Sequence, residues 1–230
     1  MNSAMACCGL LFAMSASATP LRYAEDRAPA IVNPLFATTM SEARMNELLF
    51  EGLFEDDTEL RSTARLAQTF QISEDRKTMT LHLRPDVRWH DGEPLKAADV
   101  VFTVNAMKDR TTASSEAARV AWIESVTEVD EHTVEMAFVN PEFAPQDKLH
   151  FKILPSHLFD GPAVKRSHQF RTHPIGTGPW ILQSFNDDSS ITMLNNSMYH
   201  GNGSLDEVSM REVSDKNYQA KLLVYENLEA

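Results

Sequence analysis

Histidine and its neighbours are the first residues to consider for chemistry in this chain. His90 and Asp91 are adjacent, and a histidine beside a carboxylate could act as a general base with its orienting acid. Adjacent residues in a tight turn rarely point at one another, so we expect an exposed turn and no catalytic pair. The remaining histidines show neither the H-E-x-x-H spacing nor a paired-ligand cluster, which argues against a zinc site; they stand at positions 82, 132, 150, 157, 168, 173 and 200.

Other reactive patterns are equally weak. No serine lies in a G-x-S-x-G elbow, and the only cysteines, Cys7 and Cys8, fall close to the N-terminus, which disfavours a secreted hydrolase. Gly176, Thr177 and Gly178 could suggest a phosphate-binding loop, but no lysine follows. Pro179 also lacks the amide that such a cradle needs. We therefore expect a structural crossover at this segment.

The residues that surround these patterns predict regular elements. In residues 78–84, Met79, Leu81 and Leu83 alternate with polar residues, which is typical of a half-buried strand, and residues 70–72 repeat the pattern. The polar residues 73–77 suit a hairpin loop between these strands. Gly92 after Asp91 predicts a tight turn. From residue 97 the period becomes helical, and the apolar stripe consists of Val100, Val101, Val104 and Met107.

The flanking regions predict further elements of both kinds. Strands are expected over residues 21–24, 123–129, 133–138 and 181–185, with Val134, Met136 and Phe138 pointing inward. Helices are expected over residues 41–50 and 114–121, and a helix entry over 154–159. The mixture indicates an α/β fold.

Composition bounds the function. The chain has 230 residues, of which 43% are hydrophobic and 23% charged, as in ordinary globular proteins. Its net charge of -12 argues against nucleic acid as a partner, because phosphate binding depends on clustered lysine and arginine. The sequence contains no internal repeat, heptad run or low-complexity segment.

The N-terminus predicts a location outside the cytoplasm. Residues 1–18 carry no charge, have an apolar centre and end in Ala16-Ser17-Ala18, a small-x-small cleavage pattern. We therefore expect a signal peptide at 1–18 and a periplasmic protein without cysteine. Lipid anchoring at Cys7 or Cys8 is not expected, because too few apolar residues precede them and an apolar run follows.

Two blocks of the sequence resemble one known family. The first contains Arg84, Trp89, His90, Asp91, Gly92, Pro94 and Asp99, and the second contains Gly176, Thr177, Gly178 and Pro179. Both are similar to signatures of the extracytoplasmic solute-binding proteins of the peptide/nickel/opine type, which deliver ligands to ABC importers. Lys96 departs from the pattern, because the family commonly begins this helix with Thr or Asn. Lysine cannot accept a hydrogen bond from the helix as a cap does, so about 1 kcal/mol of local stability is expected to be missing.

The resemblance implies a fold and a domain organisation. The expected class is α/β and periplasmic-binding-protein-like, of type II and the oligopeptide-binding class, with a mixed-sheet lobe and a small inserted α/β subdomain. After the signal peptide, the first lobe would begin with residues 19–53. Residues 54–172 would form the inserted peripheral subdomain, and 173–230 would continue the first lobe. The signature residues would then belong to the scaffold.

The resemblance also implies a ligand site and partners. In the family, the loop after the first strand and the loop before the following helix face the cleft between two lobes. The corresponding residues here are Arg27, Ala28, Pro29, Ala30, Thr38, Thr39, Met40 and Ser41. The expected ligand is a peptide or similar small solute, held largely through its main chain, and the expected partner is an ABC permease in the inner membrane. We expect no cofactor, no metal and a monomer at full length.

The family has a second lobe for which this chain has no counterpart. Residues 216–230 predict a helix without a stop signal, so we expect a truncated lobe. A cleft between two lobes cannot close with one, and the expectation is weak or absent binding and a tendency to aggregate. A sensor or regulator built on the same domain remains an alternative, although a DNA-binding helix-turn-helix would be expected ahead of it.

Overall fold

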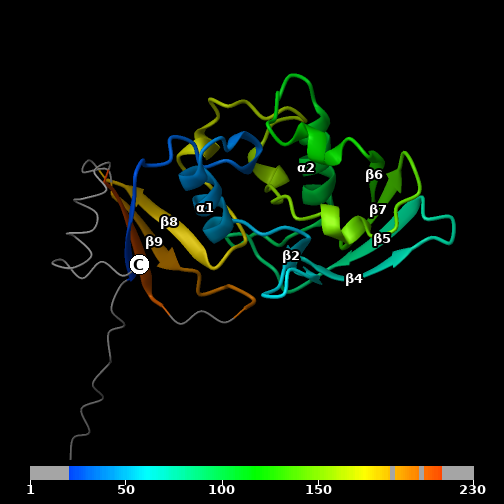
Figure 1. Cartoon of the computed structure of the whole chain (residues 1–230), viewed down its shortest axis with the longest axis horizontal. Helices are drawn as coiled ribbons and strands as arrows, with labels where there is room; N and C mark the ends of the chain where they lie inside the picture. The colour runs from blue at the N-terminus through cyan, green and yellow to red at the C-terminus, as the bar shows by residue number, and fades with distance from the viewer. Residues whose placement is uncertain (1–20, 187–189, 202–204, 214–230) are drawn as a thin grey trace, which may run out of the picture.

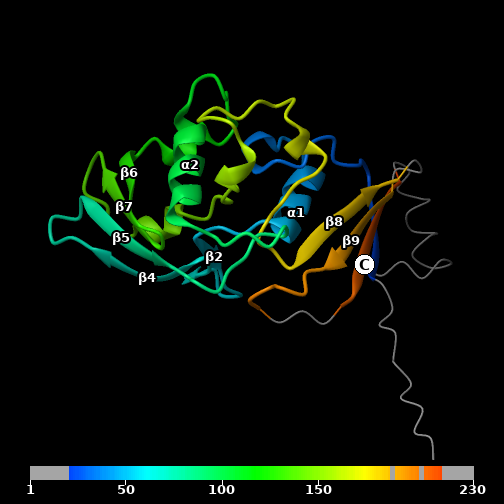
Figure 2. The same cartoon turned by 180° about the vertical axis from the view of Figure 1, so that it is seen from behind.

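The chain folds around two β-sheets that lie side by side, each with a helix packed on it (Figures 1 and 2). A computed structural model describes residues 21–186, 190–201 and 205–213. The expected signal peptide at 1–18 and the expected helix at 216–230 lie outside these described residues. The helix α1 lies over the sheet that contains β8 and β9, and α2 lies over the sheet formed by β4 to β7 (Figure 1).

The first sheet joins both ends of the described chain. Its strands are β1 (Leu21–Glu25), β10 (Glu207–Glu212), β9 (Ser190–Asn195) and β8 (Trp180–Phe185), in that spatial order. The strands β1 and β10 pair in parallel, whereas β10 with β9 and β9 with β8 pair antiparallel. The sheet is therefore mixed, as expected, and the strand predicted at residues 181–185 is confirmed as β8.

The second sheet is antiparallel throughout. Its spatial order is β4 (Ala67–Ile72), β5 (Thr78–Leu83), β7 (Thr133–Phe138) and β6 (Ile123–Asp130), while β2 (Phe54–Asp56) and β3 (Ser62–Ala64) form a separate hairpin. The predicted alternation is confirmed, because Met79 and Leu81 on β5 and Val134 and Met136 on β7 are fully buried. Period two in the sequence thus places these side chains on the face that α2 covers.

The two α-helices begin with different caps. Thr39 caps α1 (Met40–Leu49) in a capping box with Glu42. The first residue before α2 (Ala97–Lys108) is Lys96, whose side chain makes no capping hydrogen bond, as the sequence predicts. The Asp99 carboxylate accepts from the Lys96 N–H at 2.9 Å and replaces part of the missing cap.

Two predicted helices are wrong in kind. The segment expected as a helix over residues 114–121 contains only the 3-10 turn η2 (Ala117–Val120), and the expected helix entry at 154–159 contains only η4 (Ser156–Leu158). Both segments are held instead by contacts with distant parts of the chain. The N–H of Ser115 donates to the Leu35 carbonyl, and the N–H of Leu154 donates to Thr103 Oγ1. The other 3-10 turns are η1 (Pro34–Phe36), η3 (Pro145–Lys148) and η5 (Gln169–Arg171).

One hydrophobic core connects the two sheets. Ile191 and Met193 of β9 belong to the same cluster of buried side chains as Leu81 of β5 and Val104 of α2. Trp89 is the largest fully buried side chain of that cluster. The two sheets therefore share one core, and Trp89 of the first signature block lies within it.

Candidate ligand-binding site

The loops predicted to bind a ligand lie at one edge of the first sheet. Because β1 and β10 are parallel, their carboxyl ends meet at the same edge, with Glu25 opposite Glu212. The Ala28 N–H donates to Glu212 Oε2 at 3.1 Å, which fixes the loop after β1 to the end of β10. Arg44 of α1 donates to Glu25, which brings the start of α1 to the same edge. Ligands of open α/β sheets bind outside the carboxyl ends of strands, so this edge is the candidate site.

The four residues of the first loop differ in exposure. Arg27 and Ala30 are exposed, Ala28 is half-buried and Pro29 is buried. Only the exposed residues and the main chain of this loop can therefore touch a ligand without rearrangement. This arrangement suits recognition through main-chain hydrogen bonds better than recognition through a side-chain pocket.

The second predicted loop is largely occupied by its own capping contacts. Glu42 Oε2 accepts from the N–H groups of Thr38 at 2.8 Å and Thr39 at 3.1 Å, while the Glu42 N–H donates to Thr39 Oγ1. Burial alone would raise the pKa of Glu42, but these donors outweigh it and hold that pKa below its usual range. Met40 is 68% exposed and Ser41 only 6%, so Met40 and Thr38 are the accessible members of this loop.

An ion pair between a buried carboxylate and an exposed arginine sets the electrostatics of the edge. Glu25 is 6% exposed, and Arg44 donates to both of its oxygens, from Nε at 2.6 Å and from Nη2 at 3.0 Å. Burial raises the pKa of the nearby Tyr23 hydroxyl to about 12, and the negative charge of Glu25 adds to this shift. The site therefore presents a neutralised pair, with the guanidinium of Arg44 half exposed at its rim.

The signature tryptophan and aspartate bind to each other below the surface. Trp89 is fully buried, and its Nε1 donates to Asp99 Oδ2 at 3.1 Å. Asp99 Oδ1 accepts from both the N–H of Ser156 at 2.8 Å and its hydroxyl at 2.6 Å. Asp99 thus connects the turn after β5, the start of α2 and the turn η4. The scaffold role expected for both residues agrees with these contacts.

The expectation of an exposed turn is wrong for His90. Its side chain is 9% exposed and lies against the glycine segment, where Nδ1 accepts from the Gly176 N–H at 3.1 Å and Nε2 contacts the Gly178 carbonyl at 3.0 Å. The sequence could not show this, because the partners are 86 and 88 residues away. The tight turn itself is confirmed, since Gly92 has φ 92° and its N–H donates to the Trp89 carbonyl.

Asp91 and Pro94 of the first signature block hold this turn in place. Asp91 does not orient His90, since its Oδ2 lies 2.8 Å from Nε2 of His157. Pro94 forms an isolated bridge with Arg88, which closes the turn from the other side. Arg84 pairs with the exposed Asp86 and does not reach the candidate edge. The pair His90 and Asp91 therefore has no catalytic geometry.

The glycine segment passes against the end of α1. The Gly178 N–H donates to the Leu49 carbonyl at 3.0 Å, and a Cβ atom at Gly176 would lie 1.7 Å from the same oxygen. Thr177 is 2% exposed, and the Pro179 carbonyl accepts from the Asn196 N–H. Glycine is needed here for close approach of two main chains, and not for holding phosphate. The predicted structural crossover agrees with this geometry.

A cavity of about 500 Å³ lies on another side of α1. It is bounded by Asn46 and Glu47 of α1, by the segment of β2 and by His150 to Lys152. Several charges at its wall are already paired, as Glu47 is with Lys152 at 2.5 Å. Over residues 21–186, 190–201 and 205–213 we find no group of three or more metal-ligating side chains, in this cavity or elsewhere.

Comparison with known proteins decides the family. The family model "Bacterial extracellular solute-binding proteins, family 5 Middle" matches residues 62–226. The chain belongs to this family. The match confirms the resemblance drawn from the two signature blocks.

Named relatives of this family 5 chain are binding proteins. The dipeptide-binding protein of Escherichia coli is 29% identical over 204 residues, which cover 78% of this chain and 38% of the relative. The glutathione-binding protein GsiB of Pectobacterium atrosepticum is 27% identical over 225 residues, covering 94% of this chain and 43% of the relative. The chain therefore spans less than half the length of these relatives.

A solved family structure has the same fold. NikZ from Campylobacter jejuni, in complex with Ni(L-His), superposes with a TM-score of 0.82 at 25% identity, covering 91% of this chain and 42% of that structure. The likeness confirms the periplasmic-binding-protein-like α/β lobe predicted from the sequence. Among the described residues of the family 5 chain, no helix has the length and apolar character needed to cross a membrane.

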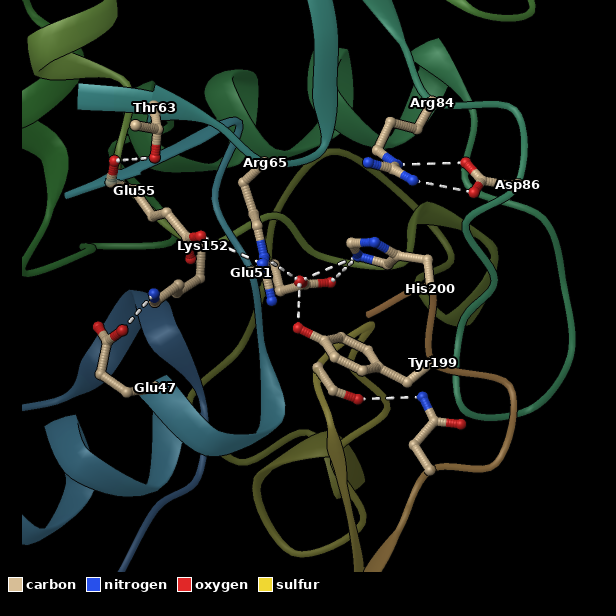
Figure 3. A network of polar contacts seen from close by, with 12 residues as sticks. Glu47, Glu51, Glu55, Thr63, Arg65, Arg84, Asp86, Lys152, Tyr199 and His200 are labelled. Atoms are coloured by element: carbon tan, nitrogen blue, oxygen red, sulfur yellow. Dashed lines mark hydrogen bonds and ion pairs between the residues drawn. The ribbon is translucent and has the colours of Figure 1, made fainter. Parts of the chain in front are cut away.

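The sequence reasoning missed a buried polar cluster centred on Glu51 (Figure 3). Glu51 is 5% exposed, and its carboxylate contacts Arg65 Nε at 2.6 Å and His200 Nε2 at 3.1 Å. The Tyr199 hydroxyl donates to the same carboxylate at 3.3 Å. A single acid inside the apolar run Leu48-Leu49-Phe50-Glu51-Gly52-Leu53-Phe54 was the signal that could have revealed a buried carboxylate with partners.

Proposed function

We propose that this chain forms the first lobe of the substrate-binding component of an ABC importer. In this proposal the protein binds peptides or a similar small solute in the periplasm and delivers them to a permease in the inner membrane. The observation that carries the proposal is the family match over residues 62–226. The names of the relatives that bind dipeptide and glutathione support a peptide-like ligand.

The ligand would lie at the carboxyl edge of β1 and β10. Exposed Arg27 and Ala30 on one loop, and Thr38 and Met40 on the other, would touch it. Extended main chain would supply most hydrogen bonds, which fits a component that accepts several side chains. The proposal includes the division into a first lobe at 19–53 and 173–230 and a peripheral subdomain at 54–172. The pairing of β1 with β10 supports that division, because it joins the two parts of the first lobe.

The proposed role is binding, without catalysis or a cofactor. The adjacent His90 and Asp91 are engaged with Gly176, Gly178 and His157 and are not free to act on a substrate. A sensor built on the same domain would use the same ligand edge. Genes for a permease and an ATPase next to this one would favour import over sensing.

Backbone amide spectra of the 230-residue chain test the ligand edge. Tri-alanine is titrated to millimolar concentration, so that weak binding is also detected. We expect shift changes concentrated at the amides of residues 27, 28, 30 and 38–41, and none at the exposed hairpin of residues 57–61. N-acetylated, C-amidated tri-alanine serves as a matched ligand without terminal charges. Shift changes confined to another surface would contradict the proposal.

A further inference from the structure

The ring of His90 can hold its present contacts only when it is neutral. The Gly176 N–H donates to Nδ1 at 3.1 Å, so Nδ1 carries no proton. The Gly178 carbonyl, 3.0 Å from Nε2, is an acceptor, so Nε2 carries the proton. A third hydrogen bond, from the His90 N–H to the Gly176 carbonyl at 2.9 Å, holds the main chains together. We call these contacts between His90 and residues 176–178 the His90 joint.

Protonation of the ring disrupts the joint for two reasons. A proton on Nδ1 would face the Gly176 N–H, so a hydrogen bond would be replaced by two opposed donors. The added charge would also be placed in a site that is 9% exposed. Burial lowers the pKa of His90, and the Gly178 carbonyl and the carboxylates of Asp91 and Glu51 offset this only in part.

The charged groups around the ring do not supply a direct partner for that added charge. Asp91 is bound to His157, and Glu51 is bound to Arg65 and His200. Neither carboxylate forms a hydrogen bond with the ring of His90. Among the described residues, the two ring nitrogens contact only Gly176 and Gly178. A protonated His90 would therefore have to leave its site in order to be solvated.

The joint connects the two sheets. His90 follows β5 of the second sheet, whereas residues 176–178 lead into β8 of the first. The same glycine segment is bound to the end of α1 through the Gly178 N–H and the Leu49 carbonyl, and to the chain after β9 through Asn196 Nδ2 and the Gly178 carbonyl. A change at His90 thus acts on the contact between the sheets.

We propose that the His90 joint is an acid-sensitive contact, which releases residues 176–178 and loosens the two sheets from each other when His90 takes up a proton. A histidine that titrates lower in the folded state than in the unfolded chain binds its proton preferentially on unfolding. The stability that the neutral His90 contributes is complete above about pH 6.5, the ordinary pKa of histidine. This stability is lost as the pH falls below that value. The inference concerns the scaffold and does not depend on the ligand.

Urea unfolding of the 230-residue chain at pH 7.5 and pH 5.5 tests the proposal. When the pH falls from 7.5 to 5.5, one histidine that stays neutral in the folded state raises the unfolding constant by up to about tenfold. His90→Asn is the test variant, because its side-chain oxygen replaces Nδ1 as the acceptor for Gly176, and Asn196 still satisfies the Gly178 carbonyl. His173→Asn is the matched control, since His173 is exposed and its ring forms a hydrogen bond only with Thr172 among the described residues.

Between pH 7.5 and pH 5.5, the unfolding constants of the parent and of the His173→Asn chain should rise by the same factor. The unfolding constant of His90→Asn should rise by a factor that is up to about tenfold smaller. If the factors by which the unfolding constants of His90→Asn and of the parent rise differ by less than about twofold, the proposal is overturned. Ring NMR signals of the parent give an independent measurement, should the variant not fold. We expect the Nε2–H tautomer at pH 7.5 and a midpoint below pH 6.5. A midpoint at or above that value, or the Nδ1–H tautomer, would also overturn it.

Discussion

Replacement of Gly176 by alanine should destabilise the chain far more than an ordinary glycine replacement. A Cβ atom at this position would lie 1.7 Å from the Leu49 carbonyl oxygen and 2.7 Å from its carbon. Real Cβ atoms essentially never come within 3.0 Å of such an atom, so the segments must separate by about 1.3 Å. Neither side can move freely, because the opposing atoms belong to the main chain at the last residue of α1.

The magnitude follows from the contacts that this separation breaks. Overpacking costs about 1–3 kcal/mol, and the Gly178–Leu49 hydrogen bond contributes about 0.5–1.5 kcal/mol more. The same separation also breaks the hydrogen bond from the Gly176 N–H to His90 Nδ1, which contributes a similar amount. We therefore expect a loss of about 2–6 kcal/mol, which lowers the melting temperature of a chain of this size by roughly 4 °C or more. Urea unfolding followed by tryptophan fluorescence, with thermal scans, measures both quantities.

Two other glycines separate steric conflict from backbone conformation. Gly161 has open space around its Cβ position and no positive φ, so Gly161→Ala should change stability by less than about 1 kcal/mol and can increase it. Gly92 also has open space but a φ of 92°, so Gly92→Ala should cost about 1–3 kcal/mol through strain alone. If Gly176→Ala were no more damaging than Gly161→Ala, the close approach of the two main chains would be refuted.

The other contacts give two further predictions. Glu51→Gln should reduce the free energy of unfolding by about 1.5–3 kcal/mol, because Arg65 and His200 lose the charge of the buried carboxylate that they share, while Arg65 keeps only its more exposed pair with Glu55; Glu59→Gln, at an exposed ion pair, should change it by less than about 0.5 kcal/mol in the same urea titration. Thr39→Ala should cost about 1 kcal/mol through loss of the α1 cap, and Thr39→Ser should restore most of it; equal stabilities for the two Thr39 variants would show that the cap contributes nothing.

The sequence was most informative where structure is local. The alternation at Met79 and Leu81 and the turn at Gly92 depend on neighbours in the chain, and all were predicted. Residues 114–121 and 154–159 form only short 3-10 turns, and contacts with distant parts of the chain hold them in place. Ser114 Oγ and Ser115 Oγ both donate to the Leu35 carbonyl, almost eighty residues earlier. The helical period of a sequence does not reveal such contacts with distant residues.

The candidate site was predictable only through the resemblance. The loops at residues 27–30 and 38–41 have no pattern that marks a binding site. Their proximity depends on the parallel pairing of β1 with β10, whose partners are almost two hundred residues apart. The exposure of Met40 and the burial of Pro29 and Ser41 likewise follow from that packing and not from residue type.

The contacts of the signature residues limit what they can do for a ligand. Nε1 of Trp89 is used by Asp99, both ring nitrogens of His90 are used by the glycine segment, and both oxygens of Asp99 accept from other parts of the chain. A side chain whose donors and acceptors are all occupied in the interior cannot exchange them for a ligand without opening the core. Changes at these residues should therefore appear as changes in stability. Under the proposed function, ligand preference would come from groups with free surface, such as Arg27 and Met40 at the carboxyl edge of β1 and β10.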